Sequence, residues 1–416
     1  MRLLYTLALR AALPLIFARL WWRSWREPGY RERIFERFGR YDQPAPPKIV
    51  WLHTVSVGEA RAAAPLVRAL KQALPEHTLL LTCMTAAGRE TLKHLYGEAV
   101  ETAWLPYDYP GAVQRFLEHF RPQAGIIMET EMWPNLLAAC AANGVPMLLA
   151  NARMSERSFR GYRRWARVTG PGIRSLATVC AQSEADANRL RRLGAQNVEV
   201  AGNLKFDVHP DATQVASGRA WHAALGRAVV LLASTREGEE EPLLKSFSTE
   251  AHSRQRAGAG PLIVVVPRHP QRFDEVAQWA DARRSRSDAA DANTRVYLGD
   301  TMGEMAFYFA AADVAVIGGS FASAGGQNLI EALAVGVPVI AGPSMFNFAE
   351  ATRLAIAAGA AVQVADTDAA ARRAFELLAD EKARATMGAA GKKLCDGNRG
   401  ATERHLAAVL RLNLAD

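Results

Sequence analysis

Two glycine pairs form the segment of this chain whose residues most clearly indicate chemistry. Gly318-Gly319 and Gly325-Gly326 follow a short apolar run and precede a run that is typical of a helix. Glycine lets the backbone approach a bulky group, and backbone N–H groups at such a turn can hold phosphate. Glu331 lies about one turn into the expected helix, where a carboxylate can accept hydrogen bonds from the hydroxyls of a ribose. The segment therefore predicts half of a nucleotide-binding unit.

A second interpretation fits these glycines as well. The phosphate fingerprints GxGxxG and GxxxxGKS/T do not occur in this segment, and glycine-rich turns also form where a strand and a helix pack tightly. The glycines alone do not separate the two interpretations, so the rest of the chain has to decide.

Charged residues follow apolar runs elsewhere in the chain. Glu59 follows a glycine, Glu129 follows an apolar run, and Lys205 stands between Leu204 and Phe206. Arg268 and His269 stand between two prolines after a run of valines. Arginine suits phosphate because its guanidinium offers a fork of N–H donors, whereas His269 could also serve only to hold its loop.

The elements that must position these residues alternate between strand and helix. This pattern predicts parallel sheets with helices on both faces, and ligands bind such sheets outside the carboxyl ends of the strands. Helices are expected at 60–74 and 328–335. The expected strands are 49–53, 79–84, 103–105, 124–128, 147–150, 178–181, 198–201, 229–233, 262–266, 297–298, 314–317 and 337–341.

A length of 416 residues predicts two domains. We expect a membrane-associated segment at 1–40, a Rossmann-like acceptor domain at 41–208 and a Rossmann-like nucleotide-binding domain at 209–416. Whether the last helix packs back on the first domain is left open. Two such α/β domains facing a cleft are typical of nucleotide-sugar glycosyltransferases, because clefts between domains favour ligand binding.

The N-terminus carries much of the excess positive charge. The chain has a formal net charge of +8, and its first 40 residues hold nine Arg and three Glu. Because the remainder is nearly neutral, nucleic acid is not expected as a partner. The apolar run 3–22, together with Trp21, Trp22 and Trp25 among Arg19, Arg23 and Arg26, predicts a membrane-anchoring helix. An amphipathic core helix is the alternative.

Cysteine and acidic patterns indicate neither a disulfide framework nor a metal centre. The four cysteines are widely spaced without a CxxC pair, which predicts buried free thiols in a reducing compartment. Asp366-Thr367-Asp368 is the candidate for a DxD metal motif, but it precedes an alanine-rich helix and is better explained as a helix N-cap.

A row of arginines has the spacing of one helical face. Arg153, Arg157, Arg160, Arg164 and Arg167 are separated by four, three, four and three residues. Like charges at this spacing repel one another. The row therefore predicts either a surface that meets phosphates of lipids or of a substrate, or a solvated face with acidic partners such as Glu156.

Nine ordered motifs carry a resemblance to a known family. They are RxRxxERFG at 31–39, SVGE at 56–59, METEMWPN at 128–135, NAR at 151–153, GNLKFD at 202–207, PRHP at 267–270, GEM at 303–305, GGSF at 318–321 and GGxNxxE at 325–331. The chain thereby resembles the 3-deoxy-D-manno-oct-2-ulosonic acid (Kdo) transferases of lipopolysaccharide synthesis, glycosyltransferase family 30. Gln327 and Ser344 stand where the family often has histidine, and Leu329-Ile330-Glu331-Ala332 departs from its usual NPLEP.

The resemblance implies a GT-B fold and an inverting transfer of Kdo from CMP-Kdo to lipid IVA, the lipid A precursor. It also implies inner-membrane lipids as partners, at the cytoplasmic face. Such transfer passes through an oxocarbenium-like state and needs a base for the acceptor hydroxyl. Glu59 is the expected base, although a glutamate in the first turn of a helix is common for its dipole alone.

The resemblance also assigns the remaining site residues. It implies that Glu129 and Lys205 stabilise the transition state, while Glu131 orients neighbours and Glu129 could instead be an ion-pair partner of Arg153 or Lys205. The implied CMP site holds Arg268, His269, Gly303, Glu304, Met305, Asn328, Leu329, Ile330 and Glu331. No metal or other cofactor is expected. Another GT-B transferase or epimerase, or a non-catalytic membrane-tethered nucleotide-binding protein, are the alternatives.

Overall fold

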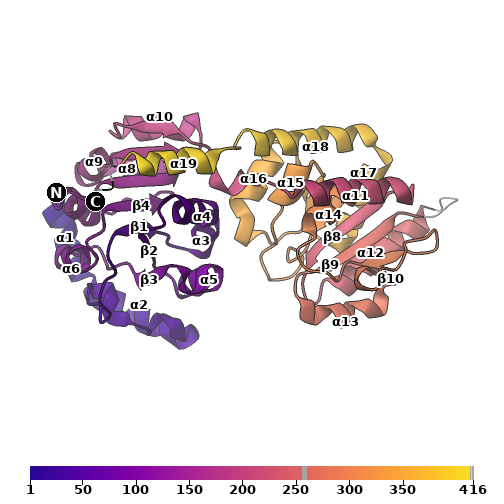
Figure 1. Ribbon diagram of the computed structural model, residues 1–416, viewed down its shortest axis with the longest axis horizontal. Coiled ribbons are helices and arrows are strands. Elements are labelled where there is room, and N and C mark those ends of the chain that lie inside the picture. Colours follow the sequence, from indigo (N-terminus) through magenta and orange to yellow (C-terminus); the bar gives the residue numbers. More distant parts are fainter. Residues whose placement is uncertain (255–259, 413, 415–416) are drawn as a thin grey trace. The chain divides into compact units, whose positions relative to one another are not determined.

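The chain folds into two compact units, which the computed structural model describes for residues 1–254, 260–412 and 414. Met1–Asp207 and Asn398–Asp416 form unit 1, and Val208–Gly397 form unit 2. Each unit is a parallel sheet with helices on both faces (Figure 1). The C-terminal segment belongs to unit 1, so the second domain ends at Gly397 and not at the end of the chain.

Unit 1 holds a seven-stranded parallel sheet in the order β3-β2-β1-β4-β5-β6-β7. Residues of β1 alternate between two apolar clusters, with Ile49 and Trp51 in one and Val50 and Leu52 in the other. Both faces of the sheet are therefore covered, which is why its strands read as apolar runs. The strands are β1 (Ile49–His53), β2 (Thr78–Cys83), β3 (Glu101–Trp104), β4 (Ala124–Met128), β5 (Met147–Ala152), β6 (Thr178–Ala181) and β7 (Val198–Val200).

The helices of unit 1 follow its strands in the alternation expected from the sequence. They are α3 (Val57–Ala62), α4 (Ala64–Ala73), α5 (Ala86–Tyr96), α6 (Pro110–Phe120), α7 (Pro134–Ala142), α8 (Glu156–Arg164), α9 (Ala166–Arg174) and α10 (Glu184–Arg192). The chain later returns as α19 (Ala401–Leu410), whose Ala408 and Val409 are buried in the same cluster as Val50.

Unit 2 repeats the architecture in the order β10-β11-β9-β8-β12-β13-β14. Its strands are β8 (Val229–Thr235), β9 (Leu262–Pro267), β10 (Ala282–Arg283), β11 (Val296–Leu298), β12 (Val314–Ile317), β13 (Val339–Ala341) and β14 (Ala361–Gln363). Its helices are α11 (Ala212–Leu225), α12 (Glu240–Ser253), α13 (Phe273–Val276), α14 (Met305–Ala311), α15 (Ile330–Val335), α16 (Ala349–Ala357), α17 (Thr367–Ala379) and α18 (Glu381–Asp396).

Most expected elements are present, and the differences have local causes. β1, β4, β6 and β12 have the expected bounds, whereas the short strands β10 and β14 were not expected because they lack an apolar run of their own. The helix expected at 60–74 is two helices, since Pro65 near the start of α4 cannot donate a backbone hydrogen bond to α3. The arginine row is also divided, because Ser155 caps α8 and leaves Arg153 outside it.

The N-terminal run folds as two helices, α1 (Arg2–Ala11) and α2 (Leu13–Arg26). Within the described residues no single helix meets the length and hydropathy needed to span a membrane, although α1 and α2, bent by 51°, meet these two criteria together. The Asn135 amide donates to the hydroxyl of buried Thr6 over 3.1 Å, and the Tyr109 hydroxyl donates to the Leu9 carbonyl over 2.8 Å. One side of α1 is thus part of unit 1, as an amphipathic core helix would be.

The outer side of this N-terminal pair is apolar. Trp21, Trp22 and Trp25 are exposed by 63%, 61% and 72%, and Leu3, Leu4, Leu7, Leu15 and Phe17 are also exposed. The side chain of Arg26 lies outside the described part of the structure.

Candidate active site

Glu59, Glu129 and the Gly318-Gly319 turn lie near the points where each sheet reverses its strand order. In unit 1 this point lies between β1 and β4, and in unit 2 it lies between β8 and β12. Open parallel sheets bind ligands in the crevice outside the strand ends at such a point. Glu59 follows β1 and Glu129 follows β4, while the Gly318-Gly319 turn follows β12. The fold therefore supplies one candidate site in each unit.

The carboxylate of Glu59 is fixed by the turn that precedes its own helix. Glu59 lies in the first turn of α3, where the Val55 backbone N–H donates to its Oε2 over 2.7 Å. The Ser56 hydroxyl donates to Oε1 over 3.4 Å. A first-turn glutamate that reaches back in this way resembles the capping box of helices. Glu59 therefore does occupy the start of a helix, as the alternative interpretation expects. Its role as a base must be argued from the pKa of its carboxyl group.

Burial gives Glu59 the acid–base behaviour of a base near neutrality. The pKa of the Glu59 carboxyl group is raised to about 8, chiefly by burial and also by the negative charges of Glu129 and Glu131. The Val55 N–H bond and the positive charge of Lys205 act in the opposite direction. A general base works best when its pKa lies close to the operating pH. Glu59 can therefore accept a proton and is the strongest candidate for that step.

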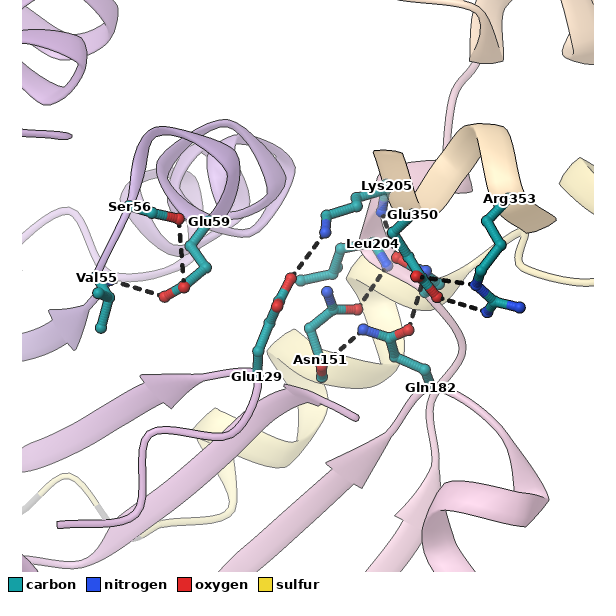
Figure 2. Close-up of polar contacts among 11 residues, drawn as sticks. Val55, Ser56, Glu59, Glu129, Asn151, Gln182, Leu204, Lys205, Glu350 and Arg353 are labelled. Atoms are coloured by element: carbon teal, nitrogen blue, oxygen red, sulfur yellow. Dashed lines mark hydrogen bonds and ion pairs between the residues drawn. The ribbon is translucent and has the colours of Figure 1, made fainter. Parts of the chain in front are cut away.

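Glu129 and Lys205 form an ion pair at the end of β4. The Lys205 Nζ lies 2.8 Å from Glu129 Oε1, and the two side chains are 21% and 19% exposed. Glu129 has a backbone φ of +60°, which is rare for a residue with a side chain and is found at functional sites. Figure 2 shows the Glu59 carboxylate directed toward Val55 and the Glu129 carboxylate directed toward Lys205. Lys205 is thus the ion-pair partner that the sequence left open for Glu129.

A chain of hydrogen bonds runs from the C-terminal helix to Lys205. The Asn151 N–H donates to His405 Nε2 of α19 over 2.9 Å. Asn151 Oδ1 accepts from the N–H of Leu204, the residue before Lys205, over 3.0 Å (Figure 2). Asn151 itself has a φ of +50°. Because His405 Nε2 accepts, the proton is on Nδ1, which donates to the Ala401 carbonyl over 2.7 Å. Burial lowers the pKa of His405 to about 4, so this tautomer is neutral at physiological pH.

His405 could not be predicted from the sequence. Its role depends on the return of the chain from unit 2 to unit 1, and no local pattern encodes that return. Glu131, by contrast, fits its expected supporting role, since the Trp133 indole N–H donates to its Oε2 over 3.1 Å. Burial raises the pKa of Glu131 above its ordinary value.

Positive side chains converge at the end of β9 in unit 2. Burial and the charges of Arg236 and Arg268 lower the pKa of His269. Arg236 follows β8, and its Nη1 donates to His269 Nε2 over 2.5 Å. Arg268 lies close enough to Glu331 to lower the pKa of that carboxyl group, although burial raises it overall. Arg268 therefore acts electrostatically on both His269 and Glu331, and Arg236 is an addition that the sequence did not suggest.

The glycine-rich turn after β12 is folded around a carboxylate of its own chain. Buried Glu239 accepts hydrogen bonds from the backbone N–H groups of Gly319, Phe321 and Ala322 over 2.6, 2.8 and 3.1 Å. It also accepts from the Arg236 N–H over 2.9 Å. The expectation that these N–H groups hold phosphate is therefore wrong for the three that Glu239 occupies.

The second glycine pair does allow a close approach, but to this chain itself. Gly325 and Gly326 have φ of +84° and +71°, and a Cβ on them would collide with Phe346 and Met345. Ser344 donates its N–H to the Ser320 carbonyl over 2.9 Å. The loop is thus held by internal contacts, and the packing interpretation accounts for these glycines.

The remaining residues expected at CMP lie in two segments of unit 2. The Asn328 amide donates to Glu331 Oε1 over 2.8 Å, while the side chains of Leu329 and Ile330 are buried, so these two could meet a ligand only through their backbone. Glu304 forms an ion pair with Arg284 at 2.9 Å, between Gly303 and the first residue of α14, Met305.

The acidic and cysteine side chains of the described residues form no metal centre. No group of three or more His, Cys, Asp or Glu side chains there could hold a metal ion. Asp366 Oδ1 accepts from the Ala369 N–H over 2.7 Å, which confirms the N-cap interpretation. All four cysteines are free and buried, as expected.

Comparison with known proteins agrees with this arrangement. Residues 32–208 match the family described as 3-Deoxy-D-manno-octulosonic-acid transferase (kdotransferase), and residues 283–394 match Glycosyl transferases group 1. The UDP-GlcNAc 2-epimerase of Neisseria meningitidis is 15% identical with a TM-score of 0.51, covering 88% of this chain and all of that one, which supports the fold. The fold and the two strand-end sites thus define a two-domain glycosyltransferase.

Curated relatives narrow the class to a family. The chain is 47% identical to the 3-deoxy-D-manno-octulosonic acid transferase of Bordetella pertussis over 97% of its own length and 98% of that protein. It is 35% identical to the protein of the same name from Haemophilus influenzae over 97% of both chains. It belongs to the family of 3-deoxy-D-manno-octulosonic acid transferases.

The first prediction concerns Glu59 as base. Replacing Glu59 with Gln keeps an oxygen for the Val55 N–H but removes the proton acceptor, so turnover should fall by about 10²-fold or more. In the unaltered protein, kcat/KM should rise as Glu59 loses its proton, through about pH 8. Steady-state rates across a pH series measure both effects.

Glu131→Gln is the matched control for this prediction. It removes a negative charge that raises the pKa of Glu59, so turnover should survive and the rise in kcat/KM should move to lower pH. A Glu59→Gln variant with near-normal turnover would contradict the assignment of the base.

A second prediction concerns His405. His405→Leu leaves the buried Asn151 N–H without an acceptor, a loss of about 1–3 kcal/mol, and loosens the turn that holds Lys205. Because Lys205 lowers the pKa of Glu59, the rise in kcat/KM should move to higher pH. His405→Gln, which supplies an acceptor, should restore the profile. A lower melting temperature with an unchanged pH profile would show that His405 stabilises the fold but does not position Lys205.

Proposed function

We propose that this chain transfers Kdo from CMP-Kdo to lipid IVA at the cytoplasmic face of the inner membrane. Kdo transfer follows from membership of the family, whereas the donor, the acceptor and the location are inferences. The observation that carries the proposal is the buried Glu59, with a pKa of about 8, in the same unit as the Glu129–Lys205 ion pair. An acceptor hydroxyl needs such a base, and a cationic sugar needs such a carboxylate.

The reaction can be assigned to the residues of the two sites. The bond between the anomeric carbon of Kdo and a phosphate oxygen breaks, and its electron pair stays with the phosphate of CMP. The acceptor oxygen forms the new bond from the opposite face, and its proton passes to Glu59. Glu129 stabilises the oxocarbenium-like sugar, and Lys205 holds that carboxylate in place over 2.8 Å.

One assay tests this function directly. The purified chain is incubated with CMP-Kdo and lipid IVA, and product masses are measured. The proposal predicts a mass increase that corresponds to one or more Kdo residues, together with released CMP. Transfer from a UDP-sugar, or binding of UDP in preference to CMP, would favour another transferase or an epimerase. Binding of CMP without any product would favour a non-catalytic protein.

Membrane association is proposed from the exposed apolar side of α1 and α2. Tryptophans favour the interface between lipid and water, and an amphipathic helix binds there through its buried apolar area. Since α1 is hydrogen-bonded to unit 1 through Thr6, deleting residues 1–25 would also uncover the surface beneath it. Point substitutions in α2 therefore give the cleaner test.

The third prediction is that replacing Trp21, Trp22 and Trp25 with Ser moves the protein from the membrane fraction to the soluble fraction. The matched control replaces Ile356 and Leu410, which are exposed apolar residues elsewhere, and should leave partitioning unchanged. Flotation with liposomes measures both variants. Equal binding of the tryptophan variant and the unaltered protein would contradict the anchor.

The arginine row offers a surface for the anionic acceptor or for anionic lipid. Arg157, Arg160, Arg164 and Arg167 are exposed on α8 and α9, and Arg160 pairs with exposed Glu156 at 3.2 Å. The solvated-face interpretation therefore holds for Arg160, whereas Arg157, Arg164 and Arg167 form no ion pair within the described residues. Each arginine near an anionic leaflet contributes about 1 kcal/mol to the free energy of membrane binding, and salt screens this attraction.

The fourth prediction follows from this charge. Replacing Arg157, Arg160 and Arg164 with Gln should raise the KM for the lipid acceptor, more at low salt than at high salt, and should hardly change the KM for CMP-Kdo. An equal loss toward both substrates would indicate a folding defect. An unchanged KM for both would leave the whole row as a solvated face.

A further inference from the structure

Arg236 is a cation at the centre of unit 2 that no assigned role accounts for. It follows directly on β8, beside the point where the strand order of the sheet reverses. Its guanidinium donates one N–H to His269 Nε2 over 2.5 Å and forms no ion pair within the described residues. Because arginine has five N–H donors, most of its donors remain available to a ligand. A half-buried arginine without a carboxylate partner indicates a site for an anion.

The surrounding backbone makes this cation necessary for binding a phosphate. Glu239 already occupies the N–H groups of Gly319, Phe321 and Ala322. A phosphate bound at the end of β12 would therefore lie near the Glu239 carboxylate, which repels it. Positive side chains must hold such a phosphate in place. Arg268 is one of them, but it lies near the charge of Glu331. Arg236 is a second cation of this group, and it forms no ion pair within the described residues.

Geometry places Arg236 over the glycine turn. A Cβ on Gly319 would lie 3.4 Å from Arg236 Cγ and 3.0 Å from Gln327 Nε2. The side chains of Arg236 and Gln327 therefore both pass across Gly319, which has a φ of +70°. Gln327 departs from the histidine that is frequent in the family, and its amide adds a neutral donor beside the guanidinium. The group at this point consists of Arg236, Arg268, His269 and Gln327.

His269 is kept in one protonation state by its neighbour. Because Arg236 can only donate, His269 Nε2 must accept, and the imidazole is neutral with its proton on Nδ1. The positive charges of Arg236 and Arg268 favour this neutral form, since both lower the pKa of His269. The positive charge available to a phosphate therefore comes from the two arginines, and His269 holds Arg236 in position.

We propose that Arg236 binds the phosphate of the nucleotide donor and stabilises the departing CMP, an inference that rests on the proposed function. Before transfer, the phosphate that links CMP to Kdo carries one negative charge. When the bond to the anomeric carbon breaks, the electron pair remains on the phosphate oxygen, and the phosphate gains a second negative charge. The hydrogen bonds from a fork of N–H donors to that oxygen are stronger in the transition state than in the ground state. This difference accelerates the reaction.

Calorimetric titration of the full chain with CMP and with cytidine tests this inference. Arg236→Gln should weaken CMP binding about 10- to 100-fold, the scale of hydrogen bonds to a charged group. Cytidine lacks the phosphate, so its affinity should not change. The CMP affinity of Arg236→Lys should lie between those of the unaltered chain and of Arg236→Gln, because a lysine keeps the charge but not the fork of donors. Arg372→Gln, at an exposed arginine of α17, is the matched control and should bind both ligands normally.

Each outcome separates this inference from the proposed function. Unaltered CMP affinity in Arg236→Gln would overturn the role of Arg236 while leaving a CMP donor intact. An equal loss of CMP and cytidine would also overturn it, because it would reflect recognition of the nucleoside or damage to the fold. If the unaltered chain binds no CMP, the donor assignment fails first, and the role of Arg236 fails with it.

Discussion

The candidate site of unit 1 depends on the burial of one carboxyl group, that of Glu59. The Val55 N–H and Ser56 hydroxyl hold it at the start of α3, so the same bonds that begin the helix also aim the side chain. Burial and two neighbouring carboxylates make its proton hard to remove. Lys205 offsets part of that effect, and Lys205 is held in turn by Glu129 and by a turn bonded to Asn151. The pKa of Glu59 therefore depends on Val55, Glu129, Glu131 and Lys205 as well as on burial.

Both units position charged side chains in the same way, at strand ends beside the point where the strand order reverses. Strands on either side of the reversal point end in residues that do not continue the apolar pattern, and the chain there adopts unusual backbone conformations. Glu129 and Asn151 have positive φ in unit 1, and Ser234 has a φ of +57° just before Arg236 in unit 2. Such conformations cost about 1–3 kcal/mol each. Their occurrence at strand ends that carry charged residues is consistent with function at both places.

The sequence predicted the sheets well because apolar runs between polar turns reflect burial on both faces. It also placed Glu59, Glu129, Lys205, Arg268 and His269 at strand ends. It did not predict His405, Arg236 or Glu239. His405 depends on a helix that returns from the far end of the chain, and Glu239 occupies N–H groups that a local pattern assigns to phosphate. These contacts join segments that are distant in sequence, and no periodicity or spacing encodes them.

Titration of the Glu59 carboxyl group itself tests the account most directly. Carbon-13 NMR of protein labelled at the glutamate carboxyl carbon, with Glu59→Gln to assign the signal, follows its protonation in the absence of substrate. The account predicts a pKa of about 8. A pKa near 4.5, the ordinary value for glutamate, would show that the carboxyl group is not buried as described and would contradict its role as a base tuned by its neighbours.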